Sequence, residues 1–122
     1  MSDKNLDKIF IRDLLVRCIV GIYPEERREK QDVIINITLH ADLTKAGQSD
    51  DIEDTVNYKT IKKEVLAMVQ SSEFLLLEKL ATEITRIALQ DSLVQRVDVS
   101  IDKPGALRFA RSVAVELSRS RN

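Results

Sequence analysis

Three polar side chains in this sequence are of types that together can move protons without a metal or a cofactor. Glu26 lies in a charged segment, Tyr58 precedes a stretch with helical spacing, and Lys103 ends an alternating segment before a Pro-Gly pair. A carboxylate, a phenol and an amine act as general acids and bases once their surroundings adjust their pKa values. Alone, each residue fits an ordinary surface or core role. As a set, they predict a proton-transfer site.

Glu78 is a fourth candidate, because its neighbours are apolar. It interrupts the run 74–81, where apolar residues recur at three- and four-residue spacing. In a helix, Glu78 lies on or beside that stripe, and a carboxylate there is costly unless it meets hydrogen-bond donors. A ligand rich in N–H groups would supply them. The alternative is a residue at the stripe's edge that reaches water or a neighbouring lysine. The stripe consists of Phe74, Leu77, Ala81, Ile84 and Ala88.

The counts of cysteine, histidine and glycine exclude several other chemistries. Cys18 and His40 are the sole residues of their types, so the chain has no intrachain disulfide and cannot assemble the nitrogen and sulfur ligands of a zinc site. Both lie in alternating segments, which favours a core role for Cys18 and argues against nucleophilic catalysis through His40. The three glycines are spread one per connection, so no phosphate-binding glycine loop is present. We expect no metal and no cofactor.

The composition is that of an ordinary globular domain. The length of 122 residues predicts a single domain over residues 1–122. The 19 Lys and Arg residues nearly balance the 20 Asp and Glu residues, so no overall charge attracts nucleic acid. The first residues lack an export signal, and no apolar run approaches the ~20 residues that span a bilayer. We therefore expect a cytoplasmic protein without a membrane or nucleic-acid partner.

Four segments alternate apolar and polar residues and predict the strands of one sheet. The first has a slip near Asp13 that indicates a bulge, and the second has one apolar and one largely polar face. The connection 21–30 is interpreted as a solvated charged loop. The polar connection 45–54 is either disordered or a site. The expected strands are 9–20, 33–40, 96–102 and 112–118.

Two helices fall between the second and third strands. Asn57 is the expected N-cap of the first helix. The second helix carries Glu78 and runs to about Gln90, with Ser71 or Ser72 as its expected cap. The order ββααββ predicts an α+β fold in which both helices cover one face of a four-stranded antiparallel sheet. Because the other face and two edges stay open, we expect the sheets to join edge to edge across subunits into a ring.

Four short segments resemble a known family. In order and spacing they are similar to dihydroneopterin aldolase of the folate pathway and to its relative dihydroneopterin triphosphate 2′-epimerase, and the resemblance covers nearly the whole chain. It implies the tunnelling fold, in which four subunits join their sheets into a barrel and two such rings stack as an octamer. The segments are Val20–Arg27, Asp54–Tyr58, Leu76–Ala81 and Asp102–Ala106.

The resemblance also implies a pterin-binding set. Glu78 resembles the anchor whose carboxylate accepts hydrogen bonds from the pterin 2-amino group and ring N–H. Backbone groups near Leu77 and Val56 assist it, and Thr55 lines the pocket. The ligand implied is a small-molecule pterin.

For the reaction itself, the resemblance implies catalysis by three residues. Lys103 resembles the catalytic lysine, Tyr58 the tyrosine that moves a proton at the cleaved side chain, and Glu26 the loop carboxylate that orients the lysine or the substrate hydroxyls. The family's site lies between adjacent subunits, with Tyr58 expected from the neighbour of the chain that supplies Glu78.

Three functions stay open on the sequence. The first choice is the aldolase, which segments 21–27 and 103–106 fit; the second is the epimerase, to which segments 31–36 and 106–110 look closer. The third is a non-catalytic pterin-binding protein. The presence of both Lys103 and Tyr58 argues against this third function. Four arginines are either cations for a substrate triphosphate or surface charge. They are Arg27, Arg28, Arg108 and Arg111.

Overall fold

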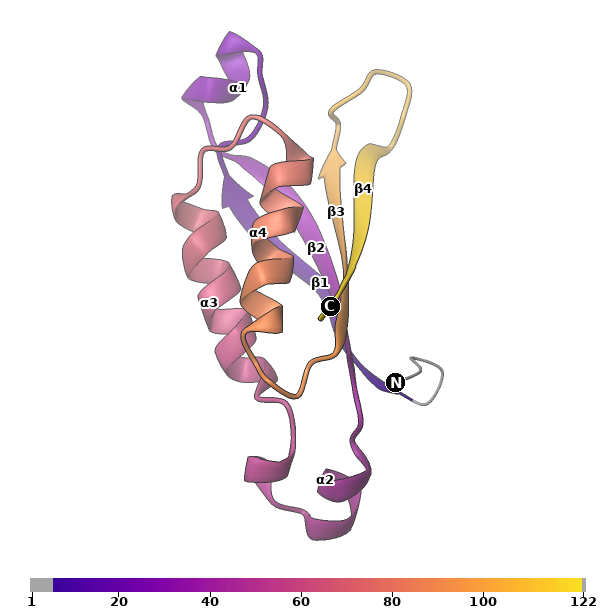
Figure 1. Cartoon of the computed structure of the whole chain (residues 1–122). Helices are drawn as coiled ribbons and strands as arrows, with labels where there is room; N and C mark the ends of the chain where they lie inside the picture. The colour runs from indigo at the N-terminus through magenta and orange to yellow at the C-terminus, as the bar shows by residue number, and fades with distance from the viewer. Residues whose placement is uncertain (1–5, 122) are drawn as a thin grey trace.

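The computed structural model describes residues 6–121, which form one four-stranded sheet with two long helices on one face (Figure 1). The strands are antiparallel and lie in the order β1-β2-β3-β4. Their bounds are β1 Asp7–Cys18, β2 Gln31–Ala41, β3 Arg96–Pro104 and β4 Ser112–Ser120. The helices are α1 Pro24–Arg28, α2 Thr44–Ser49, the 3₁₀ turn η2 Ile52–Asp54, α3 Tyr58–Ser71 and α4 Leu77–Leu89. The predicted α+β fold is confirmed.

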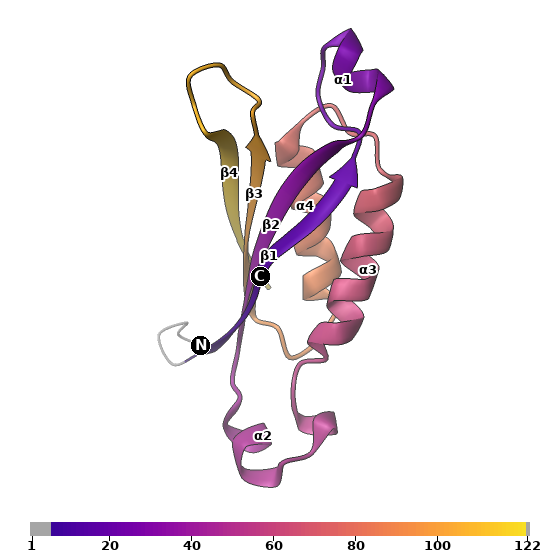
Figure 2. The same cartoon turned by 180° about the vertical axis from the view of Figure 1, so that it is seen from behind.

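The core lies between the sheet and the α3–α4 layer. Alternation along β2 turns one row of apolar side chains toward the helices, and this row is fully buried. Figure 2 shows the sheet in front of both helices, so its second face is turned away from them. Cys18 is fully buried in the core, as predicted. The helices contribute Ile61, Val65, Val69, Leu80, Ala81, Ile84 and Ala88.

Local signals at two positions are confirmed. The pairing of β1 with β2 shifts between Ile11 and Leu14, and Asp13 there has a positive φ of 55°, as expected for a bulge. The side chain of Asn57 accepts a hydrogen bond from the backbone N–H of Thr60 at 3.2 Å and so caps α3. Sequence reasoning therefore located the bulge and the start of the first helix.

The predicted cap of the second helix is wrong. α4 begins at Leu77, after Leu76, whereas Ser71 is the last residue of α3 and Ser72 follows it. The Ser72 hydroxyl donates to the carbonyl of Val69 at 2.7 Å, so it satisfies the end of α3 instead of the start of α4. A serine between two helices serves either end, and the spacing alone does not distinguish them.

The two polar connections contain short helices. Residues 21–30 include α1, and residues 45–54 include most of α2 and all of η2. In the second connection, Asp54 accepts a hydrogen bond from the Ser49 hydroxyl at 2.7 Å and pairs with Lys45 at 3.3 Å. These contacts tie η2 to α2.

The second face and both edges of the sheet remain outside the core. β1 and β4 lie at the edges, and on β1 the side chains of Phe10 and Leu15 are 49% and 61% exposed. Joining of sheets across subunits stays a prediction, which this exposed apolar surface favours. Among residues 6–121, none of the helices is long and apolar enough to cross a membrane.

Candidate active site

Lys103 occupies an inward position of β3. Val99 and Ile101 point into the core from the same strand, and the alternation puts the lysine next in that row. Only 6% of Lys103 is exposed. Its Nζ donates to the carbonyl oxygen of Val20 at 3.1 Å and to Oε2 of Glu26. Because a buried ammonium is costly without partners, these two acceptors explain how a lysine is held in the apolar row.

Glu26 reaches Lys103 from the first turn of α1. Its Oε1 accepts a hydrogen bond from the backbone N–H of Tyr23 at 3.1 Å, which fixes the carboxylate at the start of the short helix. The hydrogen bond from Lys103 lowers the pKa of Glu26 below its ordinary value of 4.5. Glu26 is therefore ionised at neutral pH, and the pair joins β3 to the β1–β2 connection.

Gly21 makes room for this carboxylate. A Cβ at position 21 would overlap Cδ and Oε1 of Glu26 and would lie only 2.6 Å from Oε2. The φ of Gly21 is +135°, a conformation that residues with a side chain rarely adopt. Both the space and the backbone turn at this position depend on glycine.

Arg27 is bonded to backbone, so the interpretation of 21–30 as a purely solvated loop is wrong. Its Nη1 donates to the carbonyl oxygens of Gly21 at 2.9 Å and Phe74 at 3.1 Å, and its Nη2 donates to that of Glu73 at 2.6 Å. The backbone N–H of Gly21 also donates to Phe74 at 3.3 Å. These bonds connect α1 to the segment between α3 and α4.

Glu78 is exposed in the single chain, as in the alternative of a residue at the stripe's edge that reaches water, and it is not buried on the stripe there. α4 begins at Leu77, which packs against the core, and its fully buried residues begin at Leu80, so Glu78 in the first turn lies outside the core. The neighbouring Lys79 does not form an ion pair with Glu78, because it pairs with Glu83 at 3.0 Å. The N-terminal turn of a helix favours a carboxylate.

The other predicted site residues lie at the opposite end of the molecule. Thr55 is half-buried, the side chain of Val56 is fully buried, and Tyr58 is 49% exposed at the first residue of α3. At ~1.5 Å per residue, the 14 residues of α3 span about 20 Å toward the α1 end (Figure 1). One chain therefore brings Glu26, Lys103, Leu77 and Glu78 to one end and the remaining three to the other.

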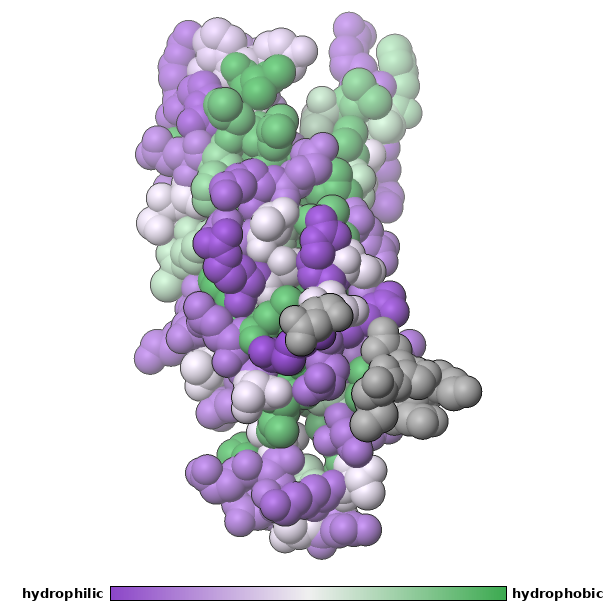
Figure 3. Space-filling view, in the orientation of Figure 1, coloured by the Kyte–Doolittle hydropathy of each residue, from purple (hydrophilic) through white to green (hydrophobic). Residues whose placement is uncertain are grey.

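Exposed apolar side chains surround the end that carries Lys103. They lie on the α1 connection, on the segment before α4 and on the β3–β4 hairpin, where Figure 3 shows hydrophobic colour over the same elements. Apolar surface gathered around a buried ion pair is typical of a ligand or subunit contact. The residues are Ile22, Tyr23, Leu75, Leu76, Leu107 and Phe109, each at least 53% exposed.

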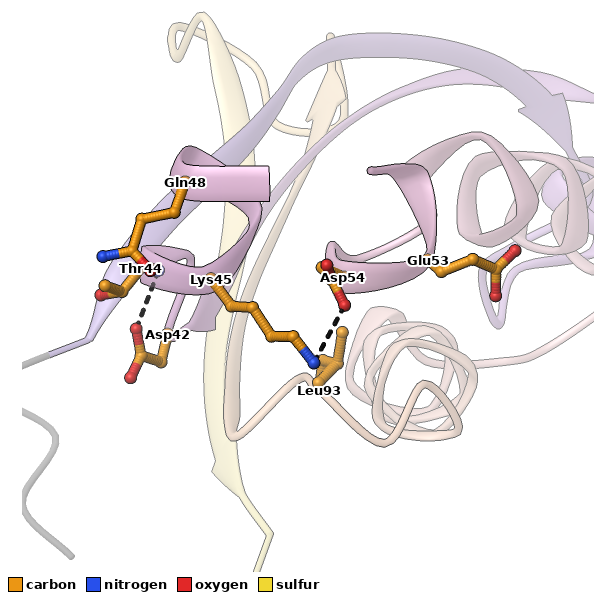
Figure 4. Close-up of a pocket in the computed structure, with 7 residues that line it drawn as sticks. All are labelled: Asp42, Thr44, Lys45, Gln48, Glu53, Asp54 and Leu93. Carbon is orange, nitrogen blue, oxygen red and sulfur yellow. Dashed lines mark hydrogen bonds and ion pairs between the residues drawn. The ribbon is translucent and has the colours of Figure 1, made fainter. Parts of the chain in front are cut away.

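Two other polar groups do not form a comparable site. Figure 4 shows a hollow beside α2 and η2, in which Lys45 pairs with Asp54. On the outer face of the sheet, His40 Nε2 lies 2.7 Å from Asp98, whose other oxygen accepts from the Ser118 hydroxyl at 2.6 Å. Because the serine bonds the aspartate and not the histidine, this is not a catalytic triad. Residues 6–121 also contain no group of three or more side chains suited to hold a metal.

The dihydroneopterin aldolase (FolB) family model matches residues 9–118, which is most of the chain. The chain belongs to the dihydroneopterin aldolase family. It is 42% identical over 113 residues to the dihydroneopterin triphosphate 2′-epimerase of Escherichia coli K12, covering 93% of this chain and 94% of that one. It is 39% identical to the folic acid synthesis protein FOL1 of Dictyostelium discoideum over 94% of this chain, and it spans 18% of that longer protein.

A solved structure supports the same membership. The E. coli dihydroneopterin aldolase in complex with neopterin superposes with a TM-score of 0.88 at 32% identity, over 93% of this chain and 99% of that one. The resemblance and the single-chain fold expected from it are therefore confirmed, while the joining of subunits into a barrel stays a prediction. Members of this family named as aldolase and as epimerase are enzymes, and both are similar to this chain.

Two residues of the site escaped sequence reasoning. The sequence predicts Gly21 only as a loop glycine and Arg27 as a triphosphate cation or a surface charge, although both lie in the first segment that resembles the family. The available signal was their spacing around Glu26: a glycine five residues before it and an arginine directly after it. That spacing indicates a role for Gly21 and Arg27 only when the turn at Gly21 is known to lie against Phe74.

Proposed function

We propose that this protein is a 7,8-dihydroneopterin aldolase that forms 6-hydroxymethyl-7,8-dihydropterin and glycolaldehyde. The observation that carries the proposal is the buried Lys103, hydrogen-bonded to Glu26, in a chain of this family. A buried amine in direct contact with a partly exposed carboxylate forms a unit that exchanges protons with a bound substrate. No other pair in residues 6–121 combines a buried lysine with a carboxylate.

The substrate supplies its own electron sink. Removal of the 2′-hydroxyl proton starts the cleavage; the C1′–C2′ bond breaks, and its electrons enter the C6=N5 unit of the dihydropterin. Glycolaldehyde departs with the new carbonyl, and a proton added at C1′ completes the product. No Schiff base is needed, so Lys103 acts as a general acid and base, with Tyr58 moving the second proton. Each such group contributes about 10²–10⁴ in rate.

The separation of the two residue groups supports a site shared between subunits. Glu78, on the first turn of α4, accepts the pterin N–H groups beside Leu77, and a second copy presents Thr55, Val56 and Tyr58. Exposure of Glu78 and Tyr58 in the single chain fits surfaces that another copy completes. An octamer of two stacked rings is the assembly we propose.

The triphosphate epimerase is the second candidate, and sequence identity favours it. The chain is 42% identical to the E. coli epimerase and 32% identical to the E. coli aldolase of known structure. In this reaction the same bond breaks, but the two-carbon aldehyde, which here carries the triphosphate, stays bound, and C1′ adds back to the opposite face of its carbonyl. Arg27 is held by backbone carbonyls, so the predicted cations left for a triphosphate are Arg28 on α1 and Arg108 and Arg111 on the hairpin after Lys103, all of them exposed.

One experiment separates the candidates. The purified protein is incubated with 7,8-dihydroneopterin and, separately, with its triphosphate, and the products are resolved by chromatography. Release of glycolaldehyde supports the aldolase, and a 2′-epimeric triphosphate supports the epimerase. Pterin binding without either product supports a non-catalytic binding protein and contradicts the proposal.

Two variants test the assigned roles. We expect Lys103→Ala to abolish turnover and keep pterin binding, and Glu78→Ala to lose pterin binding, because one residue moves protons and the other anchors the ring. Calorimetric titration with neopterin measures the binding. If the pterin affinity of Glu78→Ala were unchanged, Glu78 would not be the residue that anchors the pterin ring.

A further inference from the structure

The guanidinium of Arg27 bonds to two segments that are distant in sequence. It donates to the carbonyl oxygen of Gly21 in its own connection and to those of Glu73 and Phe74 between the two long helices. The side chain is half-buried. A guanidinium places several N–H donors on separate nitrogens in one fixed plane, so it reaches carbonyls of different segments, whereas a lysine offers all its donors from a single nitrogen.

Each bonded segment leads directly to a part of the proposed site. Glu26 precedes Arg27 in the sequence. Its carboxylate lies beside Gly21 and accepts a hydrogen bond from Lys103. Phe74 packs against the core and stands just before α4, whose first turn carries Glu78. Arg27 is thus the side chain that bonds the proton-transfer end of the chain to the segment before the pterin anchor.

We propose that Arg27 is a positioning residue that holds the Lys103–Glu26 pair at a set distance from the first turn of α4. The inference rests on the proposed function, in which Glu78 on that turn anchors the pterin ring. With the ring held there, the orientation of α1 decides how the proton-transfer pair meets the substrate side chain. A misplacement of about 1 Å can cost about 10² in rate.

The test compares Arg27→Ala and Arg27→Lys with Arg28→Ala, a matched control from the same helix whose side chain is exposed. With unphosphorylated 7,8-dihydroneopterin, we expect kcat to fall about 10–100-fold in both Arg27 variants. The neopterin dissociation constant should change by less than about threefold, because the core contacts of α4 are untouched. Arg27→Lys should fall with Arg27→Ala, since it keeps the charge and loses the fork.

Two readouts separate positioning from a simple loss of fold. Millimolar guanidinium should partly restore kcat in Arg27→Ala and leave Lys103→Ala inactive. Hydrogen exchange should increase in peptides covering 20–29 and 72–78 in Arg27→Ala, and not in Arg28→Ala. The proposal is overturned if kcat falls only in proportion to the loss of folded protein. It is also overturned if kcat is unchanged in both Arg27 variants.

The exchange measurement also works if the proposed function fails. Should the wild-type protein turn over neither pterin substrate, the assigned activity is wrong. Arg27-dependent protection of both peptides would still support the mechanical link between α1 and α4. Unchanged protection in Arg27→Ala would overturn the link whatever the substrate.

Discussion

Substitution of Gly21 by alanine is the sharpest probe of the Lys103–Glu26 pair. The added methyl would overlap the Glu26 carboxylate, whose farther oxygen lies 2.6 Å from the new Cβ. Ordinary contacts between such atoms are about 3.5 Å, so the carboxylate must move by about 1 Å. That movement takes Glu26 away from Lys103 and leaves the buried ammonium with Val20 as its remaining acceptor.

The expected loss of stability has two sources. Alanine at a φ of +135° costs about 1–3 kcal/mol in backbone strain. Displacing the carboxylate loses a hydrogen bond between charged groups, which contributes about 1.5–3 kcal/mol. We expect Gly21→Ala to lower the free energy of unfolding by about 3–6 kcal/mol and kcat by about 10²-fold.

Two other glycines supply matched controls. Gly105 has a φ of +70° and nothing within 4 Å of an added Cβ, so Gly105→Ala measures backbone strain without a collision. Gly47 lies within α2 with open space around it, and Gly47→Ala should be neutral or stabilise by up to about 1 kcal/mol. Urea unfolding at one protein concentration compares the variants, because subunit association would otherwise alter apparent stability.

A double-mutant cycle decides the cause. In a Glu26→Ala background the overlap is gone, so Gly21→Ala should cost only its backbone strain of about 1–3 kcal/mol, and the coupling between the two substitutions should be about 1.5–3 kcal/mol. If the effects of Gly21→Ala and Glu26→Ala are additive, the collision is not the cause. The reasoning would also fail if Gly21→Ala kept wild-type kcat.

Three further predictions concern assembly, pH and the thiol. Mixing inactive Tyr58→Phe and Lys103→Ala proteins under conditions that exchange subunits should restore part of the activity, because mixed interfaces hold one intact site; no recovery would contradict a shared site. The lowered pKa of Glu26 means that its stabilisation is complete above pH 4.5 and is lost as the pH falls below that value through the folded-state pKa. Urea unfolding of Glu26→Gln should therefore depend less on pH in this acid range, and equal slopes would refute the pairing. Burial raises the pKa of the Cys18 thiol above its ordinary value of 9.0, so it should react slowly with a disulfide reagent until the protein is unfolded, and fast native labelling would count against this.

Local patterns predicted the elements well where the signal lies in neighbouring residues. The bulge at Asp13 and the cap at Asn57 depend on side chains within a few positions, and both were located. The start of α4 was misplaced, since Ser72 serves the end of α3. For Glu78 the spacing left burial on the stripe and exposure at its edge both open, because helical spacing describes a direction and not the position of the helix end; the structure shows it exposed in the first turn of α4.

By itself, the sequence determined which residue types are available and which chemistries are excluded. One cysteine, one histidine and three scattered glycines limit the site to carboxylate, phenol and amine groups, and the spacing of four segments indicated the family. These properties are local, so they can be read without knowing the fold.

Only the tertiary structure decided which of these residues meet. Lys103 contacts Glu26 across 77 positions, and Arg27 bonds Phe74 across 47, because the turn at Gly21 faces both the end of β3 and the segment before α4. The same packing keeps Tyr58 a helix length away from Glu78, which the order of residues does not reveal. Contacts of this kind depend on how whole elements pack, and that arrangement is a property of the complete core.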